Sequence, residues 1–89
     1  MYYKQNDHFD FIIADNTSLA VFAPDTGAVH FFDETGIDIL NILSVPHTLQ
    51  ELLDKLCEVY TVEPATIFKD VEEFLAEAVS KRVICILNV

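Results

Sequence analysis

The chain has 89 residues, of which 52% are hydrophobic, and a formal net charge of −10 at pH 7. This length supports one folded domain with a modest core, and the hydrophobic content argues against disorder in spite of the charge. Nucleic acid is excluded as an expected partner, because the basic residues number only five and phosphate binding depends on clustered cations.

The cysteines and the polar start of the chain indicate its cellular compartment. Cys57 and Cys85 lie far apart without a C-x-x-C pair, so a zinc site is not indicated. No apolar run approaches the roughly 20 residues that a membrane span needs, and the first residues, MYYKQNDH, are too polar for a signal peptide. We expect a cytoplasmic protein in a reducing environment, with no membrane association, metal or cofactor.

Three short strands are predicted after a flexible arm of residues 1–8. Residues 9–14 (FDFIIA) and 19–23 (LAVFA) are apolar runs separated by turn formers, which indicates a hairpin. A Pro-Asp-Thr-Gly turn then leads to a third strand over residues 28–32 (AVHFF). Alternate residues of this strand point to opposite faces of the sheet, and both faces carry mainly apolar side chains. We therefore expect both of its faces to be covered, either by helices and the tail of the same domain or in part by a partner.

Three helices are predicted in the remainder of the chain. The first follows the third strand directly, with Thr35 as its N-cap. The second begins at a capping box formed by Thr48 and Glu51. The third has Pro64 in its first turn and the pair Lys81-Arg82 in its last turn.

The order of these elements predicts the fold class. The last apolar run, residues 83–89 (VICILNV), is either a short strand or a tail that closes the base of the domain. Residues 9–89 are thus expected to form one α+β domain, β-β-β-α-α-α. It consists of a three-stranded antiparallel sheet followed by three helices, similar to a winged helix-turn-helix protein.

The sequence contains no arrangement of residues that is typical of an enzyme. The only glycines, Gly27 and Gly36, are too few for a phosphate-binding loop. The histidines, His8, His30 and His47, fall in three separate segments. The acidic residues fall at helix caps and on exposed helix faces, where they are solvated. We therefore expect a protein without catalytic activity.

A resemblance to a known family is carried by TGAVHFFDETGIDILNIL and then by HTLQELLDKLCEVYTVEPATIFKDVEEFLAEAVSKRVI. The chain resembles the PqqD-like family of recognition elements for ribosomally synthesised, post-translationally modified peptides. The similarity spans residues 9–84 and depends on many positions in order rather than on one diagnostic motif. These positions are Gly27, Thr35-Gly36, Ile39-Leu40, Thr48, Tyr60, Asp70-Val71, Phe74-Leu75 and Val83-Ile84. Phe32-Asp33 and residues 44–47 (SVPH) depart from the usual family pattern, which leaves the subfamily and the pathway open.

This resemblance implies a peptide-binding function. A leader segment of a precursor peptide would add as a further strand to the edge of the third predicted strand, where N–H and C=O groups are unpaired. The protein would hold this leader while a modifying enzyme, such as a radical-SAM maturase, acts on the rest of the peptide. The strand residues expected to take part are Ala28, Val29, His30, Phe31 and Phe32.

The other wall of the binding groove is expected on the third helix. Steps of three and four residues place a set of side chains on one face of that helix. This set consists of Phe68, Glu72, Leu75 and Val79. It is offset from the stripe that is predicted to face the core, with Leu75 at the border between the two. That stripe consists of Ile67, Val71, Phe74 and Ala78. The net negative charge is expected to favour peptides that carry lysine or arginine near the groove.

Two other functions remain open on the sequence. The winged-helix architecture also suits a transcription regulator, although the charge of the chain opposes DNA binding. The same strand edge would equally suit an adaptor that binds another protein.

Overall fold

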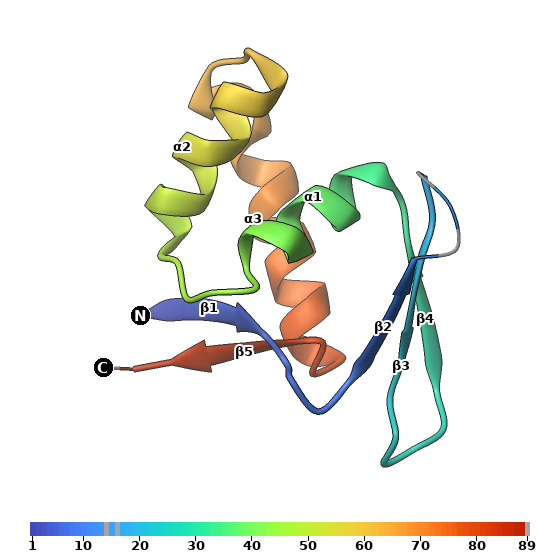
Figure 1. The fold of residues 1–89 in the computed structure, drawn as a ribbon. Coiled ribbons are helices and arrows are strands. Elements are labelled where there is room, and N and C mark those ends of the chain that lie inside the picture. The colour runs from blue at the N-terminus through green and yellow to red at the C-terminus, as the bar shows by residue number, and fades with distance from the viewer. Residues whose placement is uncertain (14, 16, 89) are drawn as a thin grey trace.

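The computed structural model describes all residues except 14, 16 and 89, so the ends of the first predicted strand and of the tail lie outside the described residues. In chain order the elements are β1 (Tyr2–Gln5), β2 (Asp10–Ile13), β3 (Leu19–Phe22), β4 (Val29–Phe32), α1 (Glu34–Ile42), α2 (Leu49–Tyr60), α3 (Pro64–Ser80) and β5 (Ile84–Leu87) (Figure 1). The predicted α+β fold, with a three-stranded antiparallel sheet followed by three helices, is confirmed. Strands β1 and β5 form a second, two-stranded sheet.

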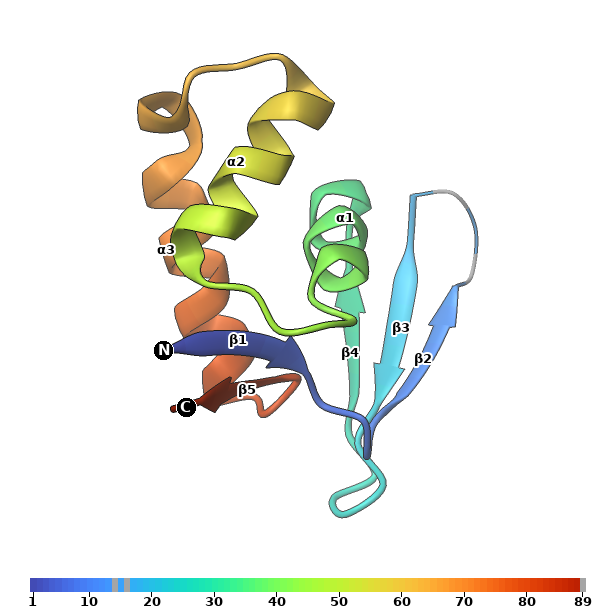
Figure 2. The same ribbon diagram turned by 60° about the vertical axis from the view of Figure 1, so that its left-hand side comes forward.

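The three-stranded sheet has the order β2-β3-β4, as expected for antiparallel strands joined by short turns. In its register, Leu19 of β3 stands opposite Phe32 of β4, and Val21 stands opposite His30. Helix α1 lies between this sheet and the other two helices (Figure 2). The inner face of the sheet is therefore the one that packs on α1.

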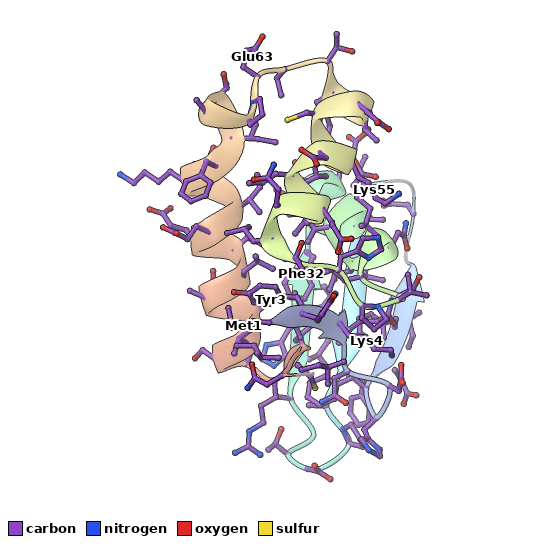
Figure 3. All side chains as sticks on the ribbon, turned by 90° about the vertical axis from the view of Figure 1, so that its left-hand side faces the viewer. Met1, Tyr3, Lys4, Phe32, Lys55 and Glu63 are labelled. Atoms are coloured by element: carbon purple, nitrogen blue, oxygen red, sulfur yellow. The ribbon has the colours of Figure 1, made fainter. Side chains whose placement is uncertain are left out.

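The start of the chain is a strand and not the flexible arm predicted for residues 1–8. Tyr2–Gln5 pair antiparallel with Ile84–Leu87, so both termini lie on the same side of the molecule (Figure 1). Tyr3 packs against the core beside α3 (Figure 3). Its N–H and C=O also form hydrogen bonds of 2.7 and 3.0 Å with the backbone of His47. The segment YYKQ has no apolar alternation that predicts a strand, since its pairing depends on β5 at the other end of the chain.

The helix starts were predicted correctly for α2 but not for α1. Helix α1 begins earlier than expected, because its N-cap is Asp33 and not Thr35. The Asp33 carboxylate accepts a hydrogen bond of 3.0 Å from the Gly36 N–H. The capping box of Thr48 and Glu51 at the start of α2 is confirmed, with reciprocal hydrogen bonds of 2.8 and 3.2 Å.

Helix α3 has Pro64 in its first turn, as predicted, but ends before the two adjacent cations. Ser80 is its last residue and Lys81 is its C-cap. Arg82 follows with a positive φ of 65°, which turns the chain toward β5. The expectation that Lys81 and Arg82 form the last turn of the helix is therefore wrong.

The core is apolar and combines side chains from both sheets and all three helices. Its largest fully buried members are Val21, Ile39, Leu40, Leu43, Leu52, Leu56, Val83 and Ile84. Complete burial of a side chain of this kind contributes about 1.5–3 kcal/mol to folding. Among the described residues no polar or charged residue is buried, so this core is held together by packing rather than by internal hydrogen bonds.

Gly36 marks the closest approach of α1 to β4. A Cβ added at this position would lie 2.9 Å from the Cβ of Phe32 and 3.2 Å from Cε2 of Phe74. The rings of these two phenylalanines pack against each other, with centroids 5.6 Å apart and an interplanar angle of 60°. Because the Phe32 Cβ is fixed to the backbone of β4, it cannot rotate away from an added methyl group. Glycine is therefore required here by the close approach of helix and strand.

We expect Gly36→Ala to lower the free energy of unfolding by about 1–3 kcal/mol, as overpacking does in other cores. The loss should appear although alanine has a helix propensity better than that of glycine by about 1 kcal/mol. Urea denaturation measures it, with Asn41→Ala on the exposed part of α1 as the control. A Gly36→Ala variant as stable as the unmodified protein would contradict the packing argument.

Candidate functional site

The edge of the three-stranded sheet formed by β4 has no partner strand among the described residues. β4 pairs with β3 on one side only. In an antiparallel pair, residues whose N–H and C=O groups bond to the partner alternate with residues whose groups point away from it. The Ala23 N–H donates to the Ala28 carbonyl at 2.8 Å, and the register places these two residues opposite each other. This bond fixes the alternation along the whole strand.

The backbone groups of two β4 residues point to the free edge. His30 and Phe32 have the same parity as Ala28, so they belong to the pairs that are hydrogen-bonded to β3. Val29 and Phe31 have the opposite parity, and their N–H and C=O groups point away from β3. The edge thus offers donors and acceptors at every second residue, which is the pattern that an added strand requires.

The side chains of β4 alternate between a covered and an uncovered face of the sheet. His30 and Phe32 are half-buried on the inner face, and Ala28 before them packs against the core. Val29 and Phe31, on the outer face, are 48% and 75% exposed. The interpretation that helices and the tail of the same domain cover both faces is therefore wrong, because the tail pairs with β1 instead.

A groove of about 320 Å³ lies between the end of β4 and helix α3, and we call it the β4–α3 groove. It is lined by Phe31, Phe32, Asp33, Phe74, Glu77, Ala78 and Lys81. Lys81 donates a hydrogen bond of 2.8 Å to Glu77, and this bond lowers the pKa of the Glu77 carboxyl. The Glu77 carboxyl is therefore ionised at neutral pH, and the two side chains form an ion pair within the groove.

The helix residues predicted to form the wall of this groove lie elsewhere. Glu72, Leu75 and Val79 line a separate pocket of about 210 Å³, beside residues of β1 and β5. Phe68 is 40% exposed and lines none of the three hollows described here. The structure therefore does not bring these four residues together with the β4 residues. A neighbouring face of α3, which carries Phe74, meets β4 instead.

Phe74 faces the core less than the sequence predicts, and Leu75, predicted at the border of the two faces, lies in the core. Leu75 is buried in the core together with Val71 and Ala78. Phe74 is only half-buried, and its ring packs on Phe32 at the β4–α3 groove. Both residues belong to a broad apolar surface of α3, so helical spacing alone does not decide which of them faces inward. That choice depends on how the helix is rotated against α2 and β5.

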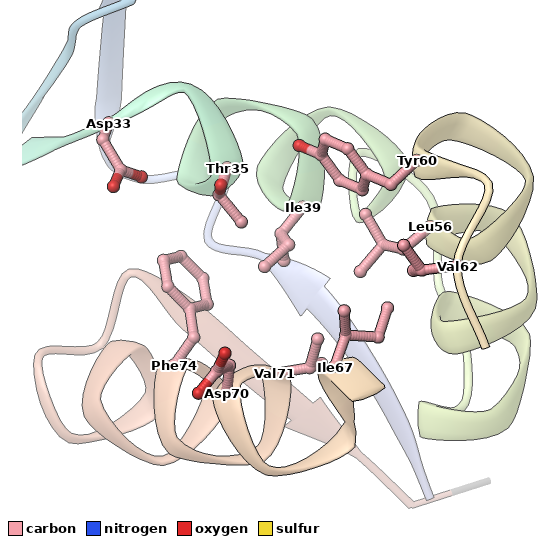
Figure 4. Close-up of a pocket in the computed structure, with 10 residues that line it drawn as sticks. All are labelled: Asp33, Thr35, Ile39, Leu56, Tyr60, Val62, Ile67, Asp70, Val71 and Phe74. Carbon is pink, nitrogen blue, oxygen red and sulfur yellow. The ribbon is translucent and has the colours of Figure 1, made fainter. Parts of the chain in front are cut away.

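A larger cavity of about 550 Å³ opens among α1, α2 and α3, and we call it the three-helix cleft (Figure 4). It is lined by Asp33, Thr35, Ile39, Leu56, Tyr60, Val62, Ile67, Asp70, Val71 and Phe74. The lining is apolar apart from two carboxylates and two hydroxyls. The cleft shares Asp33 and Phe74 with the β4–α3 groove, so the two hollows adjoin.

Tyr60 lies at the opposite end of the three-helix cleft from Phe74 (Figure 4). Its hydroxyl donates a hydrogen bond to the Asp38 carboxylate, which connects the end of α2 to α1. Partial burial, followed by this hydrogen bond, raises the pKa of the Tyr60 hydroxyl. The hydroxyl therefore remains a protonated donor at neutral pH.

The chemistry that these hollows offer is recognition of an extended, partly apolar chain. Among the described residues, no three His, Cys, Asp or Glu side chains are grouped so that they could hold a metal ion. In the same part of the chain, no helix has the length and apolar character needed to cross a membrane.

Sequence reasoning did not assign four residues of α3 and its end to the β4–α3 groove: Phe74, Glu77, Ala78 and Lys81. Their position beside β4 depends on how α3 is rotated about its axis, which the sequence does not reveal.

Comparison with known proteins yields one family and several similar structures, two of which are described here. Residues 18–84 match the sequence model of the family described as coenzyme PQQ synthesis protein D (PqqD). The fold is similar to that of TbiB1 in complex with the TbiA(beta) leader peptide, with a TM-score of 0.81 and 22% identity over 97% of this chain and 99% of that one. It is also similar to part of a heterocyclase in complex with substrate and cofactor, with a TM-score of 0.68 and 17% identity over 99% of this chain and 11% of that one. No curated protein matches the sequence.

We expect Asp33→Ala to lower the free energy of unfolding by about 1 kcal/mol, because α1 loses its N-cap. Asp33→Asn should stay within about 0.5 kcal/mol of the unmodified protein, since asparagine caps helices about as well as aspartate. Urea denaturation of these variants, with Thr35→Ala as the control, measures both effects. If Thr35→Ala is the most damaging of the three changes, the assignment of the cap to Asp33 is wrong.

Proposed function

The chain belongs to the PqqD family, and on this basis we propose that it captures the leader segment of a ribosomally synthesised precursor peptide. The leader adds as an extended strand to the free edge of β4, and its side chains enter the β4–α3 groove. TbiB1, whose fold this chain shares, is in complex with a leader peptide, which supports the same kind of ligand here.

The observation that carries this proposal is the direction of the backbone groups on β4. The N–H and C=O groups of Val29 and Phe31 point to an edge with no partner strand among the described residues. Such an edge is a template for β-strand addition, in which main-chain hydrogen bonds give affinity. Of the five strand residues expected from the sequence, these two supply the bonds to the peptide.

Selectivity comes from side chains beside the edge. The apolar surface of the β4–α3 groove is made by Phe31, Phe32, Phe74 and Ala78. An apolar leader side chain that points toward α3 would displace water from this surface, which gives a preference for particular sequences. In this proposal Phe68, Glu72, Leu75 and Val79 make no contact with the part of the leader that pairs with β4.

The protein acts by binding rather than by catalysis, and it presents the leader to a modifying enzyme. A similar fold occurs within a heterocyclase, where it makes up 11% of the chain. This supports an arrangement in which one part of an assembly binds the peptide and another part carries out the chemistry. A radical-SAM maturase is one enzyme class that would fit this role. We place the binding step in the cytoplasm, where the precursor is made and where the free thiols of Cys57 and Cys85 stay reduced.

Proline substitution at the edge tests the proposal. We expect Val29→Pro and Phe31→Pro to weaken peptide binding at least about tenfold, because each removes one edge N–H and places a ring where the added strand must lie. The hydrogen bonds between β4 and β3 are kept, since the N–H groups that proline removes point away from β3. The probe is a peptide selected for binding to the unmodified protein from a displayed library of random peptides, and fluorescence anisotropy gives its Kd.

The matched controls are Val29→Ala and Phe31→Ala, which shorten the same side chains but keep the N–H groups. Circular dichroism and thermal unfolding must show that each proline variant is folded at the temperature of the assay. If folded proline variants bind the selected peptide as tightly as their alanine counterparts, the peptide does not add to β4.

A further inference from the structure

The three-helix cleft is more negatively charged than the β4–α3 groove. Among the described residues, the cleft is lined by the carboxylates of Asp33 and Asp70 and by no lysine, arginine or histidine. The groove shares Asp33, but its other two charges, on Glu77 and Lys81, offset each other in a hydrogen-bonded ion pair of 2.8 Å. A positive charge on a peptide that occupies both hollows is therefore favoured more in the cleft than in the groove.

The two carboxylates lie at the end of the cleft that adjoins the groove. Figure 4 shows Asp33, at the junction of β4 and α1, and Asp70, on α3, at the same end as the Phe74 ring. Asp33 uses one oxygen, Oδ1, to cap α1 through the Gly36 N–H at 3.0 Å. As an ionised carboxylate it keeps further acceptor capacity for a second donor.

The surface between these carboxylates and Tyr60 is apolar. Ile39 and Val71 are fully or nearly fully buried at the base of the cleft, and the half-buried Phe74 ring stands beside them. A long side chain with an apolar stem and a charged head fits this cleft. Its stem can pack on the apolar side chains while its head stays near the two carboxylates. Lysine and arginine have this structure.

We propose that the leader continues past the end of β4 and places a lysine or arginine side chain in the three-helix cleft. Its stem packs on the half-buried side chains of Ile67 and Phe74, and its charged head interacts with the carboxylates of Asp33 and Asp70. This inference rests on the proposed function, since it assigns a second contact to a peptide that is already paired with β4. The cleft volume of about 550 Å³ also leaves room for a neighbouring apolar side chain of the peptide.

The experiment uses the full chain and a displayed library of random peptides of about 15 residues, each able to reach about 50 Å when extended. That reach exceeds the longest extent of the protein, 37 Å, so one peptide can occupy the groove and the cleft together. Sequences that bind the unmodified protein and fail to bind Val29→Pro are retained. We expect them to carry a lysine or arginine at a constant distance from an extended apolar segment.

A retained peptide is then synthesised with its basic residue and with norleucine in its place. The double variant Asp33→Asn/Asp70→Asn removes both cleft carboxylates while asparagine keeps the cap of α1. We expect it to bind the basic peptide about tenfold more weakly and the norleucine peptide equally well, because only the charged hydrogen bonds are lost.

The matched control is Glu58→Gln/Glu73→Gln, which changes the net charge equally at exposed positions outside the cleft. Its Kd for the basic peptide should remain within about twofold, because distant exposed charges are screened. Retained peptides without a basic residue, or equal losses in the two double variants, would overturn the cleft assignment while the β4 site stands. If no selected peptide is sensitive to Val29→Pro, the proposed function itself fails.

Discussion

The packing of α1 against β4 at Gly36 is the contact on which the other features of the site depend. The absence of a side chain there lets the helix approach within contact distance of Phe32, and the Phe74 ring of α3 closes on the same point. This contact covers the inner face of β4 but leaves its edge without a partner strand among the described residues. It also places α3 beside that edge, so a peptide strand added to β4 would meet an apolar helix face.

Much of this fold follows from local sequence. The hairpin of β2 and β3, the turn before β4 and the capping box of α2 are each specified by residues close together in the chain. The pairing of β1 with β5 could not be predicted in this way, because YYKQ becomes a strand only where Ile84–Leu87 lies next to it. The cap of α1 was predicted wrongly for a different reason. Thr35 and Asp33 belong to residue types that both cap helices well, and the structure uses Asp33.

The strand of the proposed site was easier to predict than its helix. The apolar run of residues 28–32 identified β4 as a strand, and the family resemblance pointed to its edge, which has no partner strand among the described residues. On α3, two overlapping apolar stripes share the same period, and the sequence does not state which one faces β4. In the structure Phe74 lines the β4–α3 groove and Leu75 is buried in the core. The rotation of a helix about its axis is set by all its neighbours at once, so local spacing cannot supply it.

The central claim is that a peptide bonds to the outward-facing backbone groups of β4, and residue-resolved amide hydrogen exchange tests it most directly. The exchange of each β4 amide would be measured by NMR with and without a selected peptide. The account predicts that the Val29 and Phe31 amides exchange rapidly in the free protein and become protected in the complex. His30 and Phe32, which already donate to β3, should be protected in both states. A bound peptide that leaves the Val29 and Phe31 amides in rapid exchange would contradict the account.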